Sequence, residues 1–322
     1  MKHYIGIDVG SVSTDFVVID EDENVIDKIY LKTEGRPINT IKQGMAQIKK
    51  DLGNISISGV GSTGSGRQLA EIMVGTDVVK NEITCHGVAA MKYNNNVNTI
   101  FEIGGQDSKI IIIRDGIIVD FAMNTVCAAG TGSFIDRQAS RLNIPIEEFG
   151  DYALESKSPV RIAGRCAVFA ESDMIHKQQL GYRESDIING LCEALVRNYL
   201  NNVGKGKDIK FPILFQGGVA ANKGIKKAFE RALGDTITVP EYYDVMGSIG
   251  AALMAKSAVG KGGTKFYGFN MIDYEYNTKS FECDGCSNIC EVVEVYINGR
   301  VGARMGGRCG KWSKLSQDTR CV

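Results

Sequence analysis

Two β-prone segments, each ending in an acidic residue, one apolar residue and a glycine turn, lie about 95 residues apart in this chain of 322 residues. The first, HYIGIDV, leads into Gly10 and continues as TDFVVID. The second, NTIFEI, leads into Gly104 and continues from Ser108. Both are typical of β-hairpins, and an Asp115-Gly116 turn with a further apolar run follows the second. This repeat predicts a duplicated βββαβα unit.

The remaining pattern predicts an α/β protein. A third glycine turn, QGGVA, follows the β-prone residues 212–215. Helices are expected at 37–51, 133–142, 167–179, 186–203, 222–233 and 245–257. We expect a first subdomain at 1–97, completed by 241–260, a second subdomain at 98–240, and a separate module at 263–322 after a glycine-rich linker at 260–263.

Composition argues against nucleic acid and membranes as partners. The 37 Lys and Arg residues balance 38 Asp and Glu residues, so there is no basic field. The start, MKHYIGIDVG, lacks the apolar core of a signal peptide, and no stretch of about 18 apolar residues follows. We expect a cytoplasmic protein. In that reducing compartment its nine cysteines should be free thiols or metal ligands rather than disulfides.

The three glycine turns are candidates for a divided nucleotide site. Phosphates need many N–H donors and a metal held by a carboxylate, which Gly10, Ser11, Ser13 and Thr14 beside Asp8 could supply, with Asp8 holding Mg²⁺ through water. Across a shared cleft, Gly104 and Gly105 would face the phosphates. Gln106 or Asp107 would orient the water that attacks the γ-phosphate. The adenosine would lie by Gly217, Gly218, Val219 and Asn222.

The alternative is that each glycine pair is only a tight turn. Other nucleotide folds are disfavoured. The chain has no GxxxxGK followed by Ser or Thr, and no GxGxxG opening a helix after the first strand.

These motifs resemble a known superfamily. IGIDVGSVST, EIGGQDSK and FQGGVAAN are similar to the phosphate-1, phosphate-2 and adenosine motifs of the acetate and sugar kinase, heat-shock chaperone and actin superfamily. Within it, NTVCAAGTGSFID and RCAVFAESD resemble the activator ATPases of 2-hydroxyacyl-CoA dehydratases and benzoyl-CoA reductases, over roughly residues 3–258. The resemblance implies a duplicated actin-like (ribonuclease H-like) ATPase fold with a small C-terminal Cys-rich module. Family members often have Asp where this chain has Glu102.

The same resemblance implies a function. It predicts an ATPase that binds ATP or ADP with Mg²⁺, takes an electron from ferredoxin or flavodoxin, and passes it to an iron–sulfur dehydratase or reductase. One 4Fe-4S cluster would be shared by a homodimer. Asp8, Gln106 and Asp107 would be catalytic, and the further cofactor contacts would be Gly130, Thr131, Gly132 and Glu171.

Cys127 and Cys166 are the candidate cluster ligands. Each opens a helix-like stretch, where a positive helix end favours an anionic cluster. Two thiolates cannot complete four ligands, but two copies of the chain can. The alternative is that both are small buried residues, and Cys85 and Cys192 are expected to be packed thiols.

A second metal site is predicted near the C-terminus. Cys283, Cys286 and Cys290 form CxxCxxxC, and Cys309 could be a fourth ligand. Structural Zn²⁺ would stabilise so short a segment, whereas a second iron–sulfur cluster would extend an electron path. We favour zinc. Cys321 is expected to be free.

Two other functions remain open from the sequence. A small-molecule kinase of the same superfamily accommodates the three phosphate motifs but leaves the cysteines unexplained. An ATP-responsive redox or metal sensor fits the C-terminal cysteines but not a water-positioning Gln106.

Overall fold

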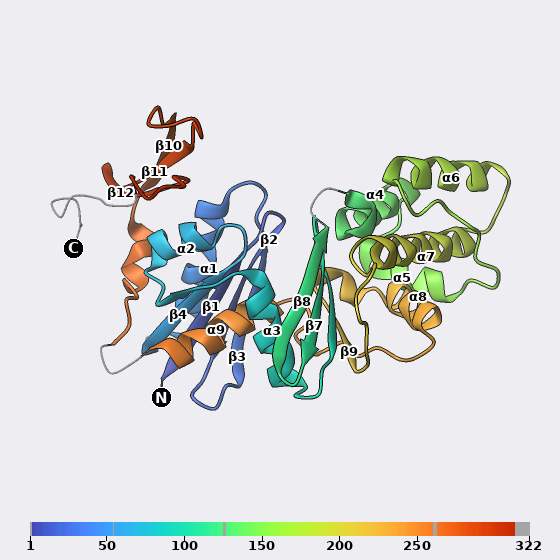
Figure 1. The fold of residues 1–322 in the computed structure, drawn as a ribbon, viewed down its shortest axis with the longest axis horizontal. Coiled ribbons are helices and arrows are strands. Elements are labelled where there is room, and N and C mark those ends of the chain that lie inside the picture. The colour runs from blue at the N-terminus through green and yellow to red at the C-terminus, as the bar shows by residue number, and fades with distance from the viewer. Residues whose placement is uncertain (1, 54, 125–126, 260–262, 313–322) are drawn as a thin grey trace. The chain divides into compact units, whose positions relative to one another are not determined.

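The computed structural model describes residues 2–53, 55–124, 127–259 and 263–312 (Figure 1). The chain forms two compact units, Met1–Asn81 with Gly247–Val322, and Glu82–Met246. The sequence placed these divisions at 97/98 and 240/241. Most of the expected linker, residues 260–262, and Cys321 lie outside the described residues. Within the described ranges, no helix has both the length and the apolar character needed to cross a membrane.

The first unit contains a five-stranded sheet with the order β3-β2-β1-β4-β5. β1, β2 and β3 are antiparallel neighbours, whereas β4 runs parallel to β1 and β5 parallel to β4. The elements of this sheet and its first two helices are β1 (His3–Val9), β2 (Ser13–Ile19), β3 (Val25–Lys32), α1 (Pro37–Leu52), β4 (Ile57–Thr63), α2 (Arg67–Val74) and β5 (Val78–Val79).

The second unit contains a four-stranded sheet with the order β8-β7-β6-β9, in which β9 runs parallel to β6 and the other neighbours are antiparallel. Its elements are α3 (Glu82–Tyr93), β6 (Thr99–Ile103), β7 (Ser108–Arg114), β8 (Ile117–Asn124), the 3-10 helix η1 (Ala128–Gly130), α4 (Gly132–Leu142), α5 (Ile146–Leu154), α6 (Ala167–Gln179), α7 (Glu184–Asn202), β9 (Ile213–Gln216), the 3-10 helix η2 (Gly218–Ala221) and α8 (Lys223–Leu233).

The strands β3-β2-β1-β4 and β8-β7-β6-β9 have the same order and directions, so the predicted duplication and the α/β fold class are confirmed. Asp115 and Gly116 form the predicted turn, with φ of 52° and 73°. The six predicted helices begin and end within about two residues of the expected bounds. Sequence periodicity missed α2, α3 and α5. α2 and α5 are only eight and nine residues long, which gives a short periodic signal, and α3 is buried over most of its surface and lacks a clear polar face.

In the first unit, glycines let a helix approach the sheet closely. Gly6 in β1 and Gly61 in β4 are direct strand partners, and a Cβ on either would overlap the backbone of α9 (Met246–Ala258). Ile7 points to the other face, where its partner Phe16 touches Gly44 of α1. α9 and α1 therefore cover opposite faces of this sheet (Figure 1).

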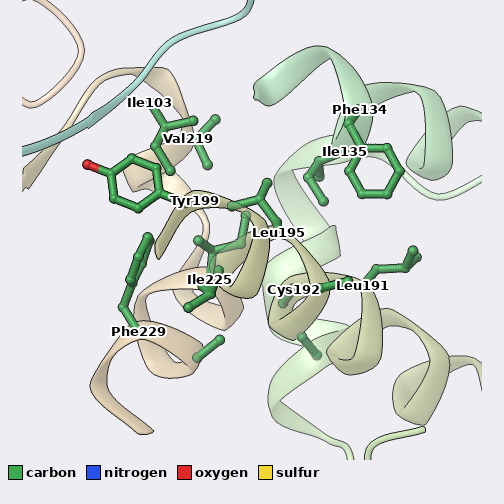
Figure 2. Close-up of a cluster of buried hydrophobic side chains, with 14 of the residues drawn as sticks. Ile103, Phe134, Ile135, Leu191, Cys192, Leu195, Tyr199, Val219, Ile225 and Phe229 are labelled. Carbon is green, nitrogen blue, oxygen red and sulfur yellow. The ribbon is translucent and has the colours of Figure 1, made fainter. Parts of the chain in front are cut away.

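The core of the second unit is built around α7. Figure 2 shows Leu191, Leu195 and Tyr199 of this helix between side chains of α4 and α8. The ring of Tyr199 packs against Phe101, with the ring centroids 5.1 Å apart. Its hydroxyl donates to the carbonyl of Lys109 at 2.7 Å. The core thus extends directly under β7.

The C-terminal module packs on α1 and α2 of the first unit. After the 3-10 helix η3 (Phe269–Asp273), it forms a three-stranded antiparallel sheet of β10 (Tyr276–Glu282), β11 (Glu291–Ile297) and β12 (Arg300–Met305). Met271 and Val295 join the core of the unit. Lys42 of α1 donates to the carbonyl of Tyr274 at 2.8 Å, and the Tyr276 hydroxyl donates to that of Met73 at 3.2 Å.

Candidate functional site

The loop after β1 is a tight turn beside a carboxylate. Asp8 is half-buried at the end of the strand, level with Thr63 in β4. Gly10 N donates to Ser13 O at 2.9 Å and closes the turn, while Ser11 is exposed. An accessible turn next to a half-buried carboxylate is compatible with the phosphate and Mg²⁺ contacts predicted here.

Thr14, a predicted phosphate contact, supports this turn from behind. It is fully buried, and its hydroxyl lies 2.9 Å from Thr33 Oγ1. Thr33 in turn donates to Gly10 O at 2.9 Å. The side chain of Thr14 therefore fixes the backbone of the glycine turn rather than facing solvent.

A second loop beside Asp8 was missed by the sequence analysis. It joins β4 to α2, and a Cβ on Gly64, whose φ is +86°, would overlap the Asp8 carboxylate. Gly66 N donates to Val9 O at 2.8 Å, and Arg67 Nη1 donates to Gly64 O at 2.9 Å. The signal was present as TGSG between a β-prone run and an amphipathic helix.

In the second unit, the loop between β6 and β7 is bonded to the start of α4. Gly132 N donates to Gly104 O at 2.9 Å, and Ser133 N donates to Gly105 O at 2.8 Å. The Ser133 hydroxyl donates to the same Gly105 oxygen. Gln106 is exposed beside these contacts. The predicted GTG segment is thus held against the predicted phosphate-2 loop by backbone hydrogen bonds.

The third glycine turn lies against the same loop. Gly217 has a φ of +87°, and a Cβ there would overlap the carbonyl of Ile103. A Cβ on Gly132 would lie 3.1 Å from Val219 Cγ2, and Val219 itself is buried in the core. Gly218 remains exposed. The second and third turns are therefore brought together, whereas their convergence with the Gly10 turn of the other unit stays a prediction.

Other predicted cofactor contacts have structural partners in this unit. Asn222 caps α8 through a 2.9 Å hydrogen bond from Ile225 N, although its buried Nδ2 has no partner within the described residues. The buried Thr131 hydroxyl donates to Ala128 O at 2.8 Å, beside buried Gly130. These side chains organise the loops at the site, and the free Nδ2 of Asn222 is a donor that a ligand could use.

Glu171, also predicted to contact the cofactor, is paired with two arginines. Its carboxylate lies 3.0 Å from Arg137 Nε and 2.8 Å from Arg141 Nη1, both on α4. The carboxylate is largely buried, whereas the two arginines are 68% and 43% exposed, so these ion pairs connect α6 to α4 at the surface.

A buried lysine lies behind the loop between β6 and β7, the predicted phosphate-2 loop. Lys109 Nζ is 2.7 Å from Asp107, 2.9 Å from Glu102 and 2.8 Å from Glu82. Burial raises the pKa of Glu102 to about 7, although Lys109 opposes that shift. Burial alone would lower the pKa of Lys109, but the three carboxylates outweigh it and raise that pKa well above the usual range. The lysine therefore stays charged and fixes the Asp107 side chain.

A histidine without a predicted role lies near this cluster. Burial, followed by repulsion from Lys109, lowers the pKa of His86 to about 3, so this histidine is neutral. Its Nδ1 is 2.8 Å from Gln216 Nε2, at the start of the third glycine turn. The sequence signal for this cluster was Lys109 at the start of the apolar run IIII, which forms a strand that is buried on both faces.

Cys127 and Cys166 occupy equivalent positions at helix starts. Cys127 precedes η1 and Cys166 precedes α6, and both are half-buried. Asn124 holds the first by accepting from Cys127 N at 3.1 Å and donating to Cys127 O at 2.9 Å. Asn198 of α7 donates to Gly164 O at 2.6 Å, two residues before Cys166, and a Cβ on Gly130 would lie 2.7 Å from Asn198 Oδ1. Both cysteine segments therefore rest on the same residue of α7.

Large apolar side chains follow Cys166. Val168 and Phe169, in the first turn of α6, are 68% and 66% exposed. Two adjacent apolar side chains therefore lie at the surface next to Cys166.

The remaining cysteines fall into two groups. Cys85 and Cys192 are fully buried, as expected for packed thiols, and burial raises the pKa of Cys192 to about 12. Cys283 is buried in the C-terminal module, Cys290 is half-buried, and Cys286 and Cys309 are exposed. Among the described residues, no three potential ligands are close enough together to hold a metal ion.

Replacing the buried cation should be costly. Lys109→Met leaves three carboxylates without their shared partner, so we expect the free energy of unfolding to fall by about 3–5 kcal/mol in chemical denaturation. Lys207→Met is the control, because Lys207 pairs at 2.8 Å with an Asp120 side chain that is 49% exposed, and it should change stability little. Equal losses in the two variants would contradict a special role for Lys109.

Glu102 should make stability depend on pH. Its folded pKa of about 7 exceeds the value of 4.5 for a free glutamate, so the folded protein binds a proton that the unfolded chain has released. Stability contributed by this group is therefore present below about pH 4.5 and is lost as pH rises to about 7. Denaturation at about pH 5 and pH 8 should show a smaller difference in Glu102→Gln than in wild type. Glu147→Gln, on the exposed first turn of α5, should keep the wild-type difference.

Sequence comparison identifies relatives over most of the chain. Residues 5–255 match the BadF/BadG/BcrA/BcrD ATPase family. An (R)-2-hydroxyglutaryl-CoA dehydratase activating ATPase from Acidaminococcus fermentans is 32% identical, over 80% of this chain and 98% of that protein. A 2-hydroxyisocaproyl-CoA dehydratase activator from Clostridioides difficile is 30% identical, over 78% of this chain and 94% of that protein.

Solved structures agree with this assignment. The crystal structure of the Acidaminococcus fermentans (R)-2-hydroxyglutaryl-CoA dehydratase component A matches with a TM-score of 0.72 and 30% identity, over 81% of this chain and 100% of that one. The activator of the 2-hydroxyisocaproyl-CoA dehydratase from Clostridium difficile, with bound ADPNP, matches with a TM-score of 0.71, 28% identity, and 80% and 95% coverage. The ethanolamine utilization protein EutJ from Carboxydothermus hydrogenoformans, at 18% identity and a TM-score of 0.53, shares the fold alone. The chain therefore belongs to the BadF/BadG/BcrA/BcrD ATPase family and has its actin-like fold.

Proposed function

We propose that this protein is an ATP-driven electron donor that activates an iron–sulfur dehydratase or reductase. The relatives that cover most of the chain are activators of 2-hydroxyacyl-CoA dehydratases, which supports a partner of that class. Ferredoxin or flavodoxin would supply the electron. The observation that carries the proposal is a continuous set of contacts between the phosphate-2 loop and the helix that begins after Cys166.

The ATP chemistry would be divided between the two glycine loops. Asp8 would hold Mg²⁺ through water, and the Gly10 turn would donate N–H groups to the phosphates. Gln106, exposed at the tip of the phosphate-2 loop, would orient the water that attacks the γ-phosphate, releasing ADP and inorganic phosphate. Asp107, paired with Lys109, would connect the loop to β7.

The contacts that could transmit a change in nucleotide state run through α4. The loop carbonyls of Gly104 and Gly105 accept from the first N–H groups of α4, and Arg137 and Arg141 of α4 pair with Glu171 of α6. Because each contact is a hydrogen bond or ion pair to a rigid helix, a displacement of the loop would move the start of α6. This is a route from phosphate binding to Cys166.

The two cysteines fit a cluster shared between subunits. Each chain offers two half-buried thiols at helix starts, which is half of the donor set that a 4Fe-4S cluster requires. When bound, such a cluster supplies a one-electron carrier. N–H groups at the starts of η1 and α6 would stabilise its negative charge, and Val168 and Phe169 would lie beside it at the subunit or partner interface.

Iron content and ATP turnover test this function directly. Anaerobically prepared wild type should form a dimer with about four iron and four sulfide per two chains, and Cys127→Ser should lose both while still binding ATP. Gln106→Ala should lower phosphate release by about tenfold or more without loss of the iron. A wild-type monomer with a complete cluster, or a phosphorylated small-molecule product, would contradict the proposal, the second in favour of a kinase.

The coupling contacts can be tested separately from hydrolysis. The double variant Arg137→Gln and Arg141→Gln should retain ATP hydrolysis and iron but reduce the ATP-dependent electron delivery to an acceptor protein by roughly threefold to tenfold. The matched control is Lys226→Gln with Lys227→Gln, because these two cations also share one carboxylate, Glu230, but within α8. Equal electron delivery in both double variants would rule out this route.

A further inference from the structure

The C-terminal module is the part of the chain that the family does not explain. The family match ends at residue 255, and the described part of the module follows from residue 263. Four cysteines, Cys283, Cys286, Cys290 and Cys309, lie in the turns that follow β10 and β12. A metal site at these cysteines would be separate from the proposed ATP chemistry and independent of it.

The register of β10 and β11 brings the first three cysteines to one end of the sheet. Glu282, the last residue of β10, pairs with Glu291, the first of β11. Cys283 and Cys290 therefore flank the turn between these strands, and Cys283 N donates to Cys290 O at 2.8 Å. Cys286 lies within this turn.

The third strand brings Cys309 to the same end. Met305, the last residue of β12, pairs with Val293 near the start of β11. Gly306 follows with a φ of +93°, so close to the carbonyl of Glu291 that a Cβ would overlap it. The chain therefore leaves β12 beside Cys290, and Cys309 is three residues farther on.

The sulfur of Cys283 has the surroundings of a thiolate. Trp312 Nε1 donates to it at 3.2 Å and Gly285 N at 3.4 Å. Lys311 adds positive charge, since its Nζ would lie 3.1 Å from a Cβ on Gly285 and lies 5.0 Å from the Trp312 ring. N–H donors and a cation around a sulfur stabilise the anionic form that binds metals.

This end of the sheet has little apolar material to hold it together. Five of the seven residues of β10 are exposed. Val292 and Cys283 are the buried side chains next to the cysteine turns, and the Phe281 ring packs on Trp312 with centroids 5.0 Å apart. A small sheet of this kind usually requires a disulfide or a metal ion for stability.

We infer that Cys283, Cys286, Cys290 and Cys309 bind a structural zinc ion at this end of the module. Four local thiolates match the tetrahedral preference of Zn²⁺ and leave no open position for catalysis. Binding requires a local rearrangement, because no three potential ligands among the described residues are close enough together. Cys286 and Cys309, both exposed in turns, would move toward the fixed sulfur of Cys283.

Metal content and tryptophan emission of the full chain test this site. Purified wild type should contain about one tightly held zinc per chain, and Cys283→Ser and Cys309→Ser should each lose it. Trp312 is the single tryptophan of the chain and bonds to the Cys283 sulfur, so its emission reports on this site alone. A chelator should shift the emission of wild type to longer wavelength, and added Zn²⁺ should restore it.

The control separates this site from the proposed shared cluster. The double variant Cys127→Ser and Cys166→Ser should lose iron but keep the zinc and the chelator-sensitive emission. Zinc retained in both Cys283→Ser and Cys309→Ser would overturn the inference. So would iron with sulfide in place of zinc at these cysteines, or wild type that takes up no added Zn²⁺ and shows unchanged emission with a chelator.

Discussion

The first backbone N–H groups of α4 donate to the carbonyls of Gly104 and Gly105, and this contact holds the loop after β6 against the helix. Glycines at the start of α4 and in the neighbouring turn leave room for this close approach. A Cβ on Gly132 would lie 3.0 Å from Gly104 O, and one on Gly217 would overlap the carbonyl of Ile103. As a result, three motifs far apart in the sequence meet at one place. A loop held in this way cannot shift without moving α4.

The second constraint is electrostatic. Lys109 is buried within β7 and neutralises carboxylates from α3, from β6 and from the loop itself. Such an arrangement is expensive to desolvate and adds little net stability, but it allows few geometries. Together with the neutral His86 bonded to Gln216, it positions the loop from behind while the exposed Gln106 remains accessible. Rigidity behind the loop and accessibility in front of it are what a water-positioning residue requires.

The C-terminal module differs from the two cores in how little apolar surface it buries at one end. The two units bury large cores around α7 and around β1, whereas the end of the module at Cys283 contributes few buried side chains. Its attachment to α1 and α2 through Met271, Val295 and Lys42 stabilises the other side of the sheet only. A zinc ion would supply the missing stability by covalent bonds to sulfur, independently of nucleotide.

The amino-acid sequence determined the repeated strand pattern and six helices, because alternation, helical periodicity and glycine turns are local properties of the chain. It also marked Asp8, Gln106, Cys127 and Cys166 as candidates through their motifs. Only the tertiary structure decided that Glu171 pairs with two arginines, that Thr14 supports a turn from behind, and that Lys109 joins three carboxylates. These contacts link residues from separate elements, and their energies depend on burial and distance, which no local pattern encodes.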